Sequence, residues 1–230
     1  MKIIIVGTAF PYRGGLAAYN ERLAREYVKQ GHEVEILTFK LQYPAFLFPG
    51  NTQYSQELTP KDLKITRAIN SVNPLNWRKV GLQIKAKAPD KVIFCYWMAF
   101  MAPCFGTIAR YARSPKTKMI GLIHNMIPHE PTILDKLFPS YFVSAMDGFV
   151  AMADSVVADI NCFDKKNKPK AVSPHPIYDH YGESLTKKEA AMKLGLYEQK
   201  PYILFFGFIR YYKGLDLLIE AFADERLRAF

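Results

Sequence analysis

The sequence contains little cysteine and no long uninterrupted hydrophobic segment. Its three cysteines, Cys95, Cys104 and Cys162, include no C-x-x-C pair and cannot all form disulfides, which is typical of reduced, mostly buried thiols in a cytoplasmic protein. The longest apolar stretch, Val92–Gly106, is shorter than the roughly 20 residues of a membrane-spanning helix and contains Pro103. We therefore expect a cytoplasmic chain that does not cross a membrane by itself.

Acidic residues are also scarce relative to basic ones. Lysine and arginine number 31, against 21 aspartates and glutamates, and the formal net charge is +10. This balance favours an anionic partner, such as nucleotide phosphates, acidic lipid head groups or nucleic acid. The basic turn 164–170 has no aromatic platforms and no recognised binding motif, so a solvated loop is the better interpretation and we expect no nucleic-acid partner.

Signals of disorder and secretion are absent as well. Only 13 glycines and 15 prolines occur among 230 residues, and 50% of the residues are hydrophobic, which is enough for a sizeable core. Met1–Gly7 is too short in its apolar part for a secretory signal and has no cleavage site, so we expect the mature protein to begin at Met1. The length allows one large domain, or one domain and part of another.

The first forty residues indicate a strand–helix–strand unit. Lys2–Gly7 is a run of β-branched residues, which is typical of a strand buried on both faces. A Gly/Pro-rich loop follows at residues 8–15, and apolar residues then recur at helical spacing up to Gly31. Glu33–Phe39 supplies the next strand, so the segment predicts a right-handed βαβ unit.

The same alternation continues to residue 172. We expect further strands at Leu63–Arg67, Val92–Tyr96, Met119–His124, Phe149–Ala151 and Ala171–Val172, with helices at Leu75–Lys87, Pro103–Arg113, Thr132–Val143 and Ser155–Phe163. This pattern predicts an α/β fold with a doubly wound, Rossmann-type parallel sheet. Ligands of such sheets bind at the carboxyl ends of the strands, which places Gly14-Gly15 and the His124–Glu130 loop on one edge.

A second α/β segment is expected after this domain. The extended connector Ser173–Pro176 precedes a helix that should begin at the capping box Thr186–Glu189 and end at Gly195. A strand at Tyr202–Gly207 and a final helix reaching Phe230 repeat the pattern of the amino terminus. We therefore predict a domain at 1–172, a linker with a connecting helix at 173–200, and the first strand–helix unit of a truncated second domain at 201–230.

Two loops combine glycine with the start of a helix. Gly14 and Gly15 let the backbone approach a ligand closely, and the N–H groups of the helix that follows favour a phosphate or carboxylate; a flexible turn is the alternative. The loop lacks G-x-G-x-x-G, and no acidic residue follows the second strand, which argues against NAD. After Gly207, Arg210 and Lys213 could clamp a diphosphate, where the alternative is two solvated charges.

Histidine and aromatic residues supply the remaining candidates. His124 stands at the end of a buried strand, the usual place for a working residue in an open α/β sheet, although a lone histidine is more often structural. A zinc site at His124 and His129, or at His175 and His180, has no matching cysteines and no H-E-x-x-H, so no metal is expected. The loop Phe39–Gly50 could line an acceptor groove, dip into a membrane interface, or pack back on the domain.

Four segments, taken in order, carry a resemblance to a known family. They are Pro11–Asn20, Leu41–Pro44 with Phe48–Gly50, His124–Glu130, and Ile203–Gly207 leading to Lys213–Phe222. Together they resemble the retaining glycosyltransferases of family 4, which have the two-domain GT-B fold. The resemblance implies transfer of a sugar from a nucleotide diphosphate donor to a glycan or lipid-linked glycan acceptor. It implies no metal, and no cofactor either, because the nucleotide sugar is a substrate. Contact with the inner face of the cell membrane would be peripheral at most.

The resemblance also implies roles for individual residues. Gly14 and Gly15 would bind the donor phosphate through backbone N–H groups, and His124 would lie beside the transferred sugar as the catalytic residue. Arg210 and Lys213 would neutralise the leaving nucleoside diphosphate. The candidates on the acceptor side are Asn125, His129, Glu130 and Tyr43.

The chain departs from the family pattern in two ways. Phe208, rather than an arginine, follows Gly207 directly, and Arg210 comes two positions later. The E-x7-E element, which holds the donor sugar, should lie beyond Phe230, so we expect the 230-residue chain alone to be inactive. Two other functions stay open: a non-catalytic module that binds an anionic glycan or partner chain, and a sugar-nucleotide epimerase of related fold.

Overall fold

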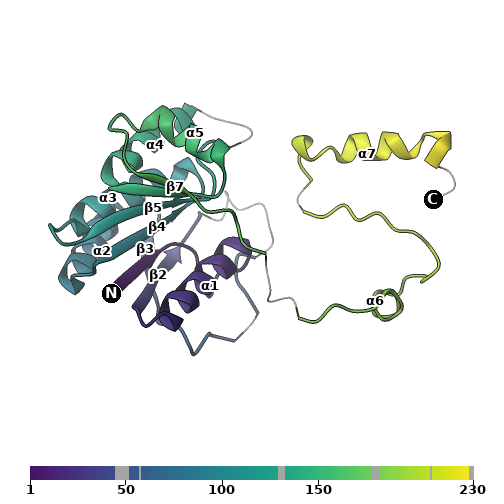
Figure 1. Ribbon diagram of the computed structural model, residues 1–230, viewed down its shortest axis with the longest axis horizontal. Helices are drawn as coiled ribbons and strands as arrows, with labels where there is room; N and C mark the ends of the chain where they lie inside the picture. Colours follow the sequence, from purple (N-terminus) through teal and green to yellow (C-terminus); the bar gives the residue numbers. More distant parts are fainter. Residues whose placement is uncertain (45–51, 57, 129–132, 178–181, 208, 228–230) are drawn as a thin grey trace. The chain divides into compact units, whose positions relative to one another are not determined.

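The computed structural model describes residues 1–44, 52–56, 58–128, 133–177, 182–207 and 209–227. The chain divides into two compact units, Met1–His175 and Pro176–Phe230 (Figure 1). Within the described ranges, every helix is too short or too polar to span a bilayer.

A seven-stranded parallel sheet forms the centre of the first unit. Its strands are β1 (Lys2–Val6), β2 (Glu33–Leu41), β3 (Ile65–Asn70), β4 (Lys91–Tyr96), β5 (Lys118–Ile123), β6 (Gly148–Ala151) and β7 (Lys170–Val172). They lie in the order β3-β2-β1-β4-β5-β6-β7, and every pair is parallel. The strand order therefore reverses direction between β1 and β4, at the centre of the sheet.

Helices cover both faces of this sheet. They are α1 (Gly15–Lys29), α2 (Pro74–Lys87), the short 3-10 helix η2 (Ala99–Met101), α3 (Ala102–Ala112), α4 (Ile133–Ala145) and α5 (Asp154–Phe163). On one face, Ile3 and Ile5 of β1 pack in a buried cluster with Ala24 of α1. On the other face, a larger cluster buries Phe105 of α3 and Phe142 of α4. Right-handed crossovers account for this division, because the chain leaves β1 in one direction along the sheet and returns past it in the other.

The predicted α/β, doubly wound Rossmann-type fold is confirmed. All seven strands and all five helices expected before residue 172 are present, most of them with ends shifted by one or two residues. The second strand is longer than expected, because Lys40 and Leu41 continue the pairing of β2 with β3. The prolonged strand takes in the first residues of the loop that we assigned to Phe39–Gly50, whereas residues 45–50 lie outside the described residues.

The second unit contains short helices joined by extended segments. They are α6 (Lys187–Leu194), the 3-10 helix η3 (Tyr211–Lys213), α7 (Leu215–Phe222) and the 3-10 helix η4 (Glu225–Leu227). The start and end of α6 follow the sequence signals: Thr186 and Glu189 form a capping box, and Gly195 ends the helix with φ 65°.

Two expectations for this second unit are wrong. Residues 202–207 do not form a strand, because no described segment pairs with them. A strand is held by hydrogen bonds to a neighbour and by cover for its side chains, and here Leu204 and Phe206 are 82% and 85% exposed. The final helix ends at Phe222 rather than at Phe230.

Candidate functional site

The carboxyl edge of the first unit's sheet gathers the predicted site residues. The glycine loop 7–14 follows β1, Tyr43 follows β2, Trp97 follows β4, and His124 follows β5. Because the strand order reverses between β1 and β4, this edge is the place where an open parallel sheet binds its ligands.

The loop between β1 and α1 is fixed by hydrogen bonds from its backbone. The N–H of Ala9 donates to Oγ1 of Thr38 (3.0 Å), and the N–H of Phe10 donates to Oε1 of Glu21 (2.8 Å). These bonds tie the loop to β2 on one side and to α1 on the other. The loop therefore delivers the chain to the start of α1 in one defined conformation.

The N-terminus of α1 is open to an anion. Gly14 precedes the helix with φ 110°, a left-handed conformation that favours glycine, and no side chain caps the helix here. The first turn, which begins at Gly15, has no acidic residue. Its N–H groups carry the partial positive charge of the helix dipole, and a phosphate or carboxylate would satisfy them.

His124 lies against α1 on the same edge. The backbone N–H of His124 donates to the backbone carbonyl oxygen of Tyr96 (2.9 Å). The His124 ring meets the Tyr19 ring edge-on, with 4.8 Å between their centroids. The His175 ring lies 6.3 Å away. Burial, together with electrostatic repulsion from His175, lowers the pKa of His124 to about 4.

These surroundings fix the chemical character of the His124 imidazole. With its pKa near 4, the ring is neutral at pH 7, so it can exchange hydrogen bonds with a hydroxyl or carbonyl group but carries no charge. Its Nε2 atom is buried and has no hydrogen-bond partner among the described residues. A buried polar atom without a partner is costly, and a ligand hydroxyl group would satisfy it.

Aromatic side chains form one wall of this edge. The hydroxyl oxygen of Tyr43 accepts a hydrogen bond from Nε1 of Trp97 (2.7 Å), and the Tyr43 ring packs against Phe100 at 6.3 Å. Burial raises the pKa of Tyr43 despite hydrogen bonds to Gln42 and Trp97 that lower it. The phenol therefore stays protonated at neutral pH and can donate as well as accept a hydrogen bond.

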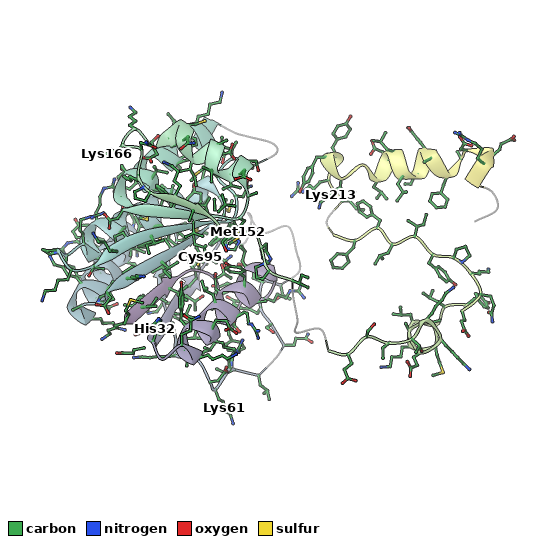
Figure 2. All side chains as sticks on the ribbon, viewed as in Figure 1. His32, Lys61, Cys95, Met152, Lys166 and Lys213 are labelled. Atoms are coloured by element: carbon green, nitrogen blue, oxygen red, sulfur yellow. The ribbon has the colours of Figure 1, made fainter. Side chains whose placement is uncertain are left out.

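The other predicted site residues stand as follows. Asn125 is half-buried in the bend that follows His124, while His129 and Glu130 lie outside the described residues. Arg210 and Lys213 flank η3 in the second unit, and Figure 2 shows Lys213 beside the start of α7. Both side chains are exposed, and their role in binding a diphosphate stays a prediction.

Sequence reasoning missed three residues of this edge. Tyr19 lies within the Pro11–Asn20 segment but was given no role of its own, although its ring lies against both His124 and His175. His175 was considered only as a zinc ligand, and no group of three or more His, Cys, Asp or Glu side chains in the described ranges could hold a metal ion. Trp97 had a usable signal, because it follows a buried strand directly, as His124 does.

This fold defines a Rossmann-like α/β domain with an uncapped helix N-terminus at the carboxyl edge of its sheet. The sequence profile described as Glycosyltransferase Family 4 matches residues 13–177. The chain therefore belongs to glycosyltransferase family 4, as the resemblance of its segments predicted. No curated protein sequence gives a significant match.

Two solved structures are similar to the chain. One is an α-glucosyltransferase in complex with UDP and a 13-mer DNA containing a central A:G mismatch, with 12% identity, a TM-score of 0.46, and coverage of 75% of this chain and 40% of that chain. The other is UDP-GlcNAc 2-epimerase from Methanocaldococcus jannaschii, with 13% identity, a TM-score of 0.48, and coverage of 75% and 45%. The matched part of the chain spans less than half the length of each.

Proposed function

We propose that this chain is the amino-terminal domain and the first part of the second domain of a retaining glycosyltransferase. The reaction moves a sugar from a nucleotide diphosphate donor to a glycan or lipid-linked glycan, and it needs no metal and no cofactor. The observation that supports this proposal is the carboxyl edge of the sheet, where an uncapped helix N-terminus and the buried Nε2 atom of His124 lie on neighbouring elements. Membership of family 4 makes a sugar nucleotide the natural ligand for such a pair.

The helix N-terminus suits the diphosphate of the donor, and His124 suits its sugar. The N–H groups that follow Gly14 and Gly15 bind a phosphate of the diphosphate through charge-assisted hydrogen bonds. The neutral imidazole of His124 bonds a hydroxyl group of the sugar and orients it for transfer. The neutral imidazole of His124 has no charge that would attract the phosphate. The phosphate therefore binds at the helix N-terminus, and the sugar binds at His124.

Two cations of the second unit supply the remaining charge. We assign Arg210 and Lys213 to the leaving nucleoside diphosphate, because negative charge builds up there as the bond to the sugar breaks. Nζ of Lys213 lies 5.6 Å from the centroid of the Tyr212 ring. Its charge stays exposed to solvent and available to a phosphate.

The acceptor lies on the other side of the transferred sugar in this proposal. Asn125, His129, Glu130 and Tyr43 are its candidate ligands, since three follow His124 and the fourth stands on the aromatic wall. A cytoplasmic protein with a charge of +10 could meet a lipid-linked acceptor at the inner face of the membrane through peripheral contact.

The Lys213→Ala variant tests the phosphate assignment. In a protein that includes the donor-binding half, we expect this variant to slow transfer at least roughly tenfold, mainly through kcat, because the lost charge acts on the leaving group. Lys200→Ala is the matched control, since Lys200 also lies over a tyrosine ring, that of Tyr197, in the same unit. The assay measures transfer from a panel of nucleotide sugars to glycan acceptors.

The outcomes of this assay separate the functions that the sequence left open. Equal turnover of Lys213→Ala and Lys200→Ala would remove the phosphate assignment. Interconversion of the nucleotide sugar without acceptor would identify an epimerase. Acceptor binding without any turnover would identify a binding module.

A further inference from the structure

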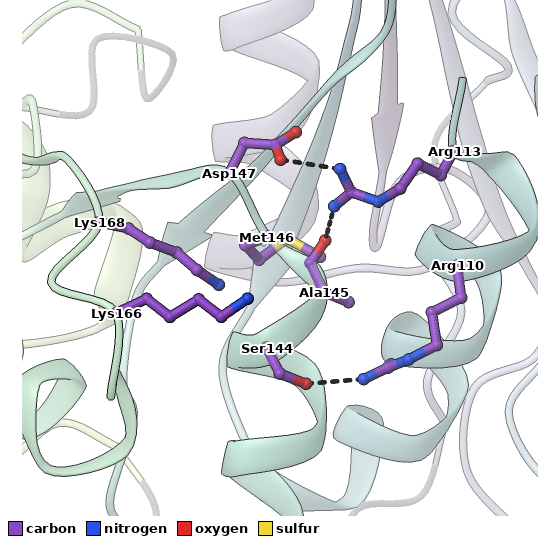
Figure 3. A pocket seen from close by; sticks show the side chains of 8 residues that line it. All are labelled: Arg110, Arg113, Ser144, Ala145, Met146, Asp147, Lys166 and Lys168. Atoms are coloured by element: carbon purple, nitrogen blue, oxygen red, sulfur yellow. Dashed lines mark hydrogen bonds and ion pairs between the residues drawn. The ribbon is translucent and has the colours of Figure 1, made fainter. Parts of the chain in front are cut away.

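A charged cavity lies at the opposite edge of the sheet from His124. It has a volume of about 490 Å³ (Figure 3). Its lining residues are Arg110 and Arg113 at the C-terminal end of α3, residues 144–147 at the C-terminal end of α4, and Lys166 and Lys168 of the α5–β7 loop. The next elements, β6 and β7, begin at Gly148 and Lys170. The cavity is thus built at the amino ends of the strands, and the site described above uses none of its residues.

The loop that carries Lys166 and Lys168 is fixed by contacts with the side chain of Asp164. The buried carboxylate of Asp164 accepts hydrogen bonds from the backbone N–H groups of Lys166 (3.2 Å) and Lys168 (2.7 Å), and it pairs with Nζ of Lys170 at 2.7 Å. Figure 3 shows the side chains of Lys166 and Lys168 extending together toward the end of α4. Their ammonium groups are therefore brought to the same side before any ligand binds.

The cavity holds more positive than negative charge. Its only acidic lining residue, Asp147, forms an ion pair with Arg113 at 2.8 Å. Arg110, Lys166 and Lys168 have no paired carboxylate within ion-pair distance in the described part of the chain. Three positive charges thus face a solvent-accessible hollow without neutralisation.

Helix capping explains part of this arrangement. Lys168 Nζ donates to the carbonyl oxygen of Val143 (2.7 Å), and Arg110 donates to that of Tyr141 (2.9 Å), so both satisfy carbonyl groups near the C-terminus of α4. Capping does not explain Lys166, whose ammonium group has no partner among the described residues. Burial lowers the pKa of Lys168, and the charges of Lys166 and Arg113 lower it further, although Asp164 and Asp147 oppose them.

We propose that this cavity binds a phosphoryl group, either free phosphate or a phosphate monoester, with Lys166 as its main ligand. Arg110 and Lys168 are already engaged with the protein, so they act as fixed positive charges beside the anion. Among the described residues, Asp147 is the one acidic residue that lines the cavity. Its carboxylate is held in place by Arg113 and by the backbone N–H of Met119 (2.7 Å). The volume leaves room for a small organic group on the phosphate.

Inorganic phosphate is the first probe. It is titrated into the 230-residue chain at constant ionic strength, with chloride as the balancing anion, while NMR follows the backbone amides of residues 144–148 and 164–170. We expect a saturable shift confined to these amides, and Lys166→Ala should weaken binding roughly tenfold. Lys165→Ala is the matched control, because it removes an adjacent exposed lysine that does not line the cavity.

A second arm identifies the source of the phosphate. Vesicles of phosphatidylcholine with or without phosphatidic acid are added to the same variants. Lys166-dependent binding only to vesicles with phosphatidic acid assigns a lipid head group, whereas saturation by inorganic phosphate without vesicle binding assigns a soluble ester. If phosphate shifts the amides no more than chloride does and the vesicles do not bind, or if the two lysine variants behave alike, the proposal is overturned. Arg110 and Lys168 then only cap α4, and Lys166 is a solvated surface charge.

Discussion

At the scale of single residues, His124 shows how position alone can change the chemistry of a side chain. Burial and electrostatic repulsion from His175 lower its pKa from 6.5 to about 4 in the folded protein. Because the folded state binds a proton less readily than the unfolded state, the stability from this residue is complete above pH 6.5. It is lost progressively as the pH falls from 6.5 toward 4, by ~3 kcal/mol at most.

We predict that His124→Gln removes this pH dependence. The glutamine side chain does not titrate, so the free energy of unfolding of the variant should fall less than that of the wild type between pH 7 and pH 4.5. Urea unfolding at several pH values measures both. The buried or paired carboxylates of Glu35 and Asp164 also have lowered pKa values and lose stability at low pH, but they do so equally in both proteins. Parallel curves for the two proteins would show that folding does not lower the pKa of His124.

The sequence predicted where His124 stands but not what surrounds it. Its place after a buried strand follows from the order of apolar runs, which is a local property of the chain. Its contacts with Tyr19 and His175 join positions more than 50 residues away in either direction, and no local pattern reports them. The same holds for the hydrogen bond from Trp97 to Tyr43.

At the scale of elements, the packing of α2 against α3 depends on a glycine. A Cβ atom on Gly81 would lie 2.5 Å from Cβ of Tyr111 and 2.7 Å from the carbonyl oxygen of Ile108. The second contact is with backbone, so the helices must separate to accommodate even one methyl group. The glycine therefore sets the distance between these two helices.

We predict that Gly81→Ala destabilises the protein by ~1–3 kcal/mol. Alanine normally stabilises a helix by about 1 kcal/mol relative to glycine, so the clash must reverse the usual sign. Gln83→Ala, on the exposed side of the same helix, is the control and should change the stability by less than about 0.5 kcal/mol. Chemical denaturation measures both variants. An alanine variant as stable as the wild type would mean that α2 and α3 separate without loss.

Strands were predictable from the sequence where both of their faces are buried in the same way. The β-branched runs of β1 and β4 are buried on both faces, so their composition alone identifies central strands. Residues 202–207 carry the same kind of apolar run, yet they form no strand, because composition cannot supply the neighbouring strands that the pairing requires. The Thr186 capping box was predictable for the opposite reason, since all its hydrogen bonds lie within one turn.

At the scale of the whole molecule, the two units differ in how much they bury. The first unit has buried clusters on both faces of its sheet, whereas in the described part of the second unit only Ala191 is a buried hydrophobic residue. Apolar burial is the main favourable term in folding, so the second unit contributes little stability by itself. The cooperative unfolding of the chain should therefore be that of Met1–His175.

Hydrogen exchange measures this difference directly. We predict that backbone amides in β1 and β4 exchange only through global unfolding, which for a domain of this kind costs about 5–15 kcal/mol and slows exchange by at least about a thousandfold. Amides of residues 203–206 should exchange almost as fast as in an unstructured peptide, since no described backbone group accepts their hydrogen bonds. The amides of α6 should fall between the two, because its caps hold a single short helix. Protection of residues 203–206 equal to that of β4, in a chain shown to be monomeric, would mean that this segment is paired in solution and that the second unit has a core of its own.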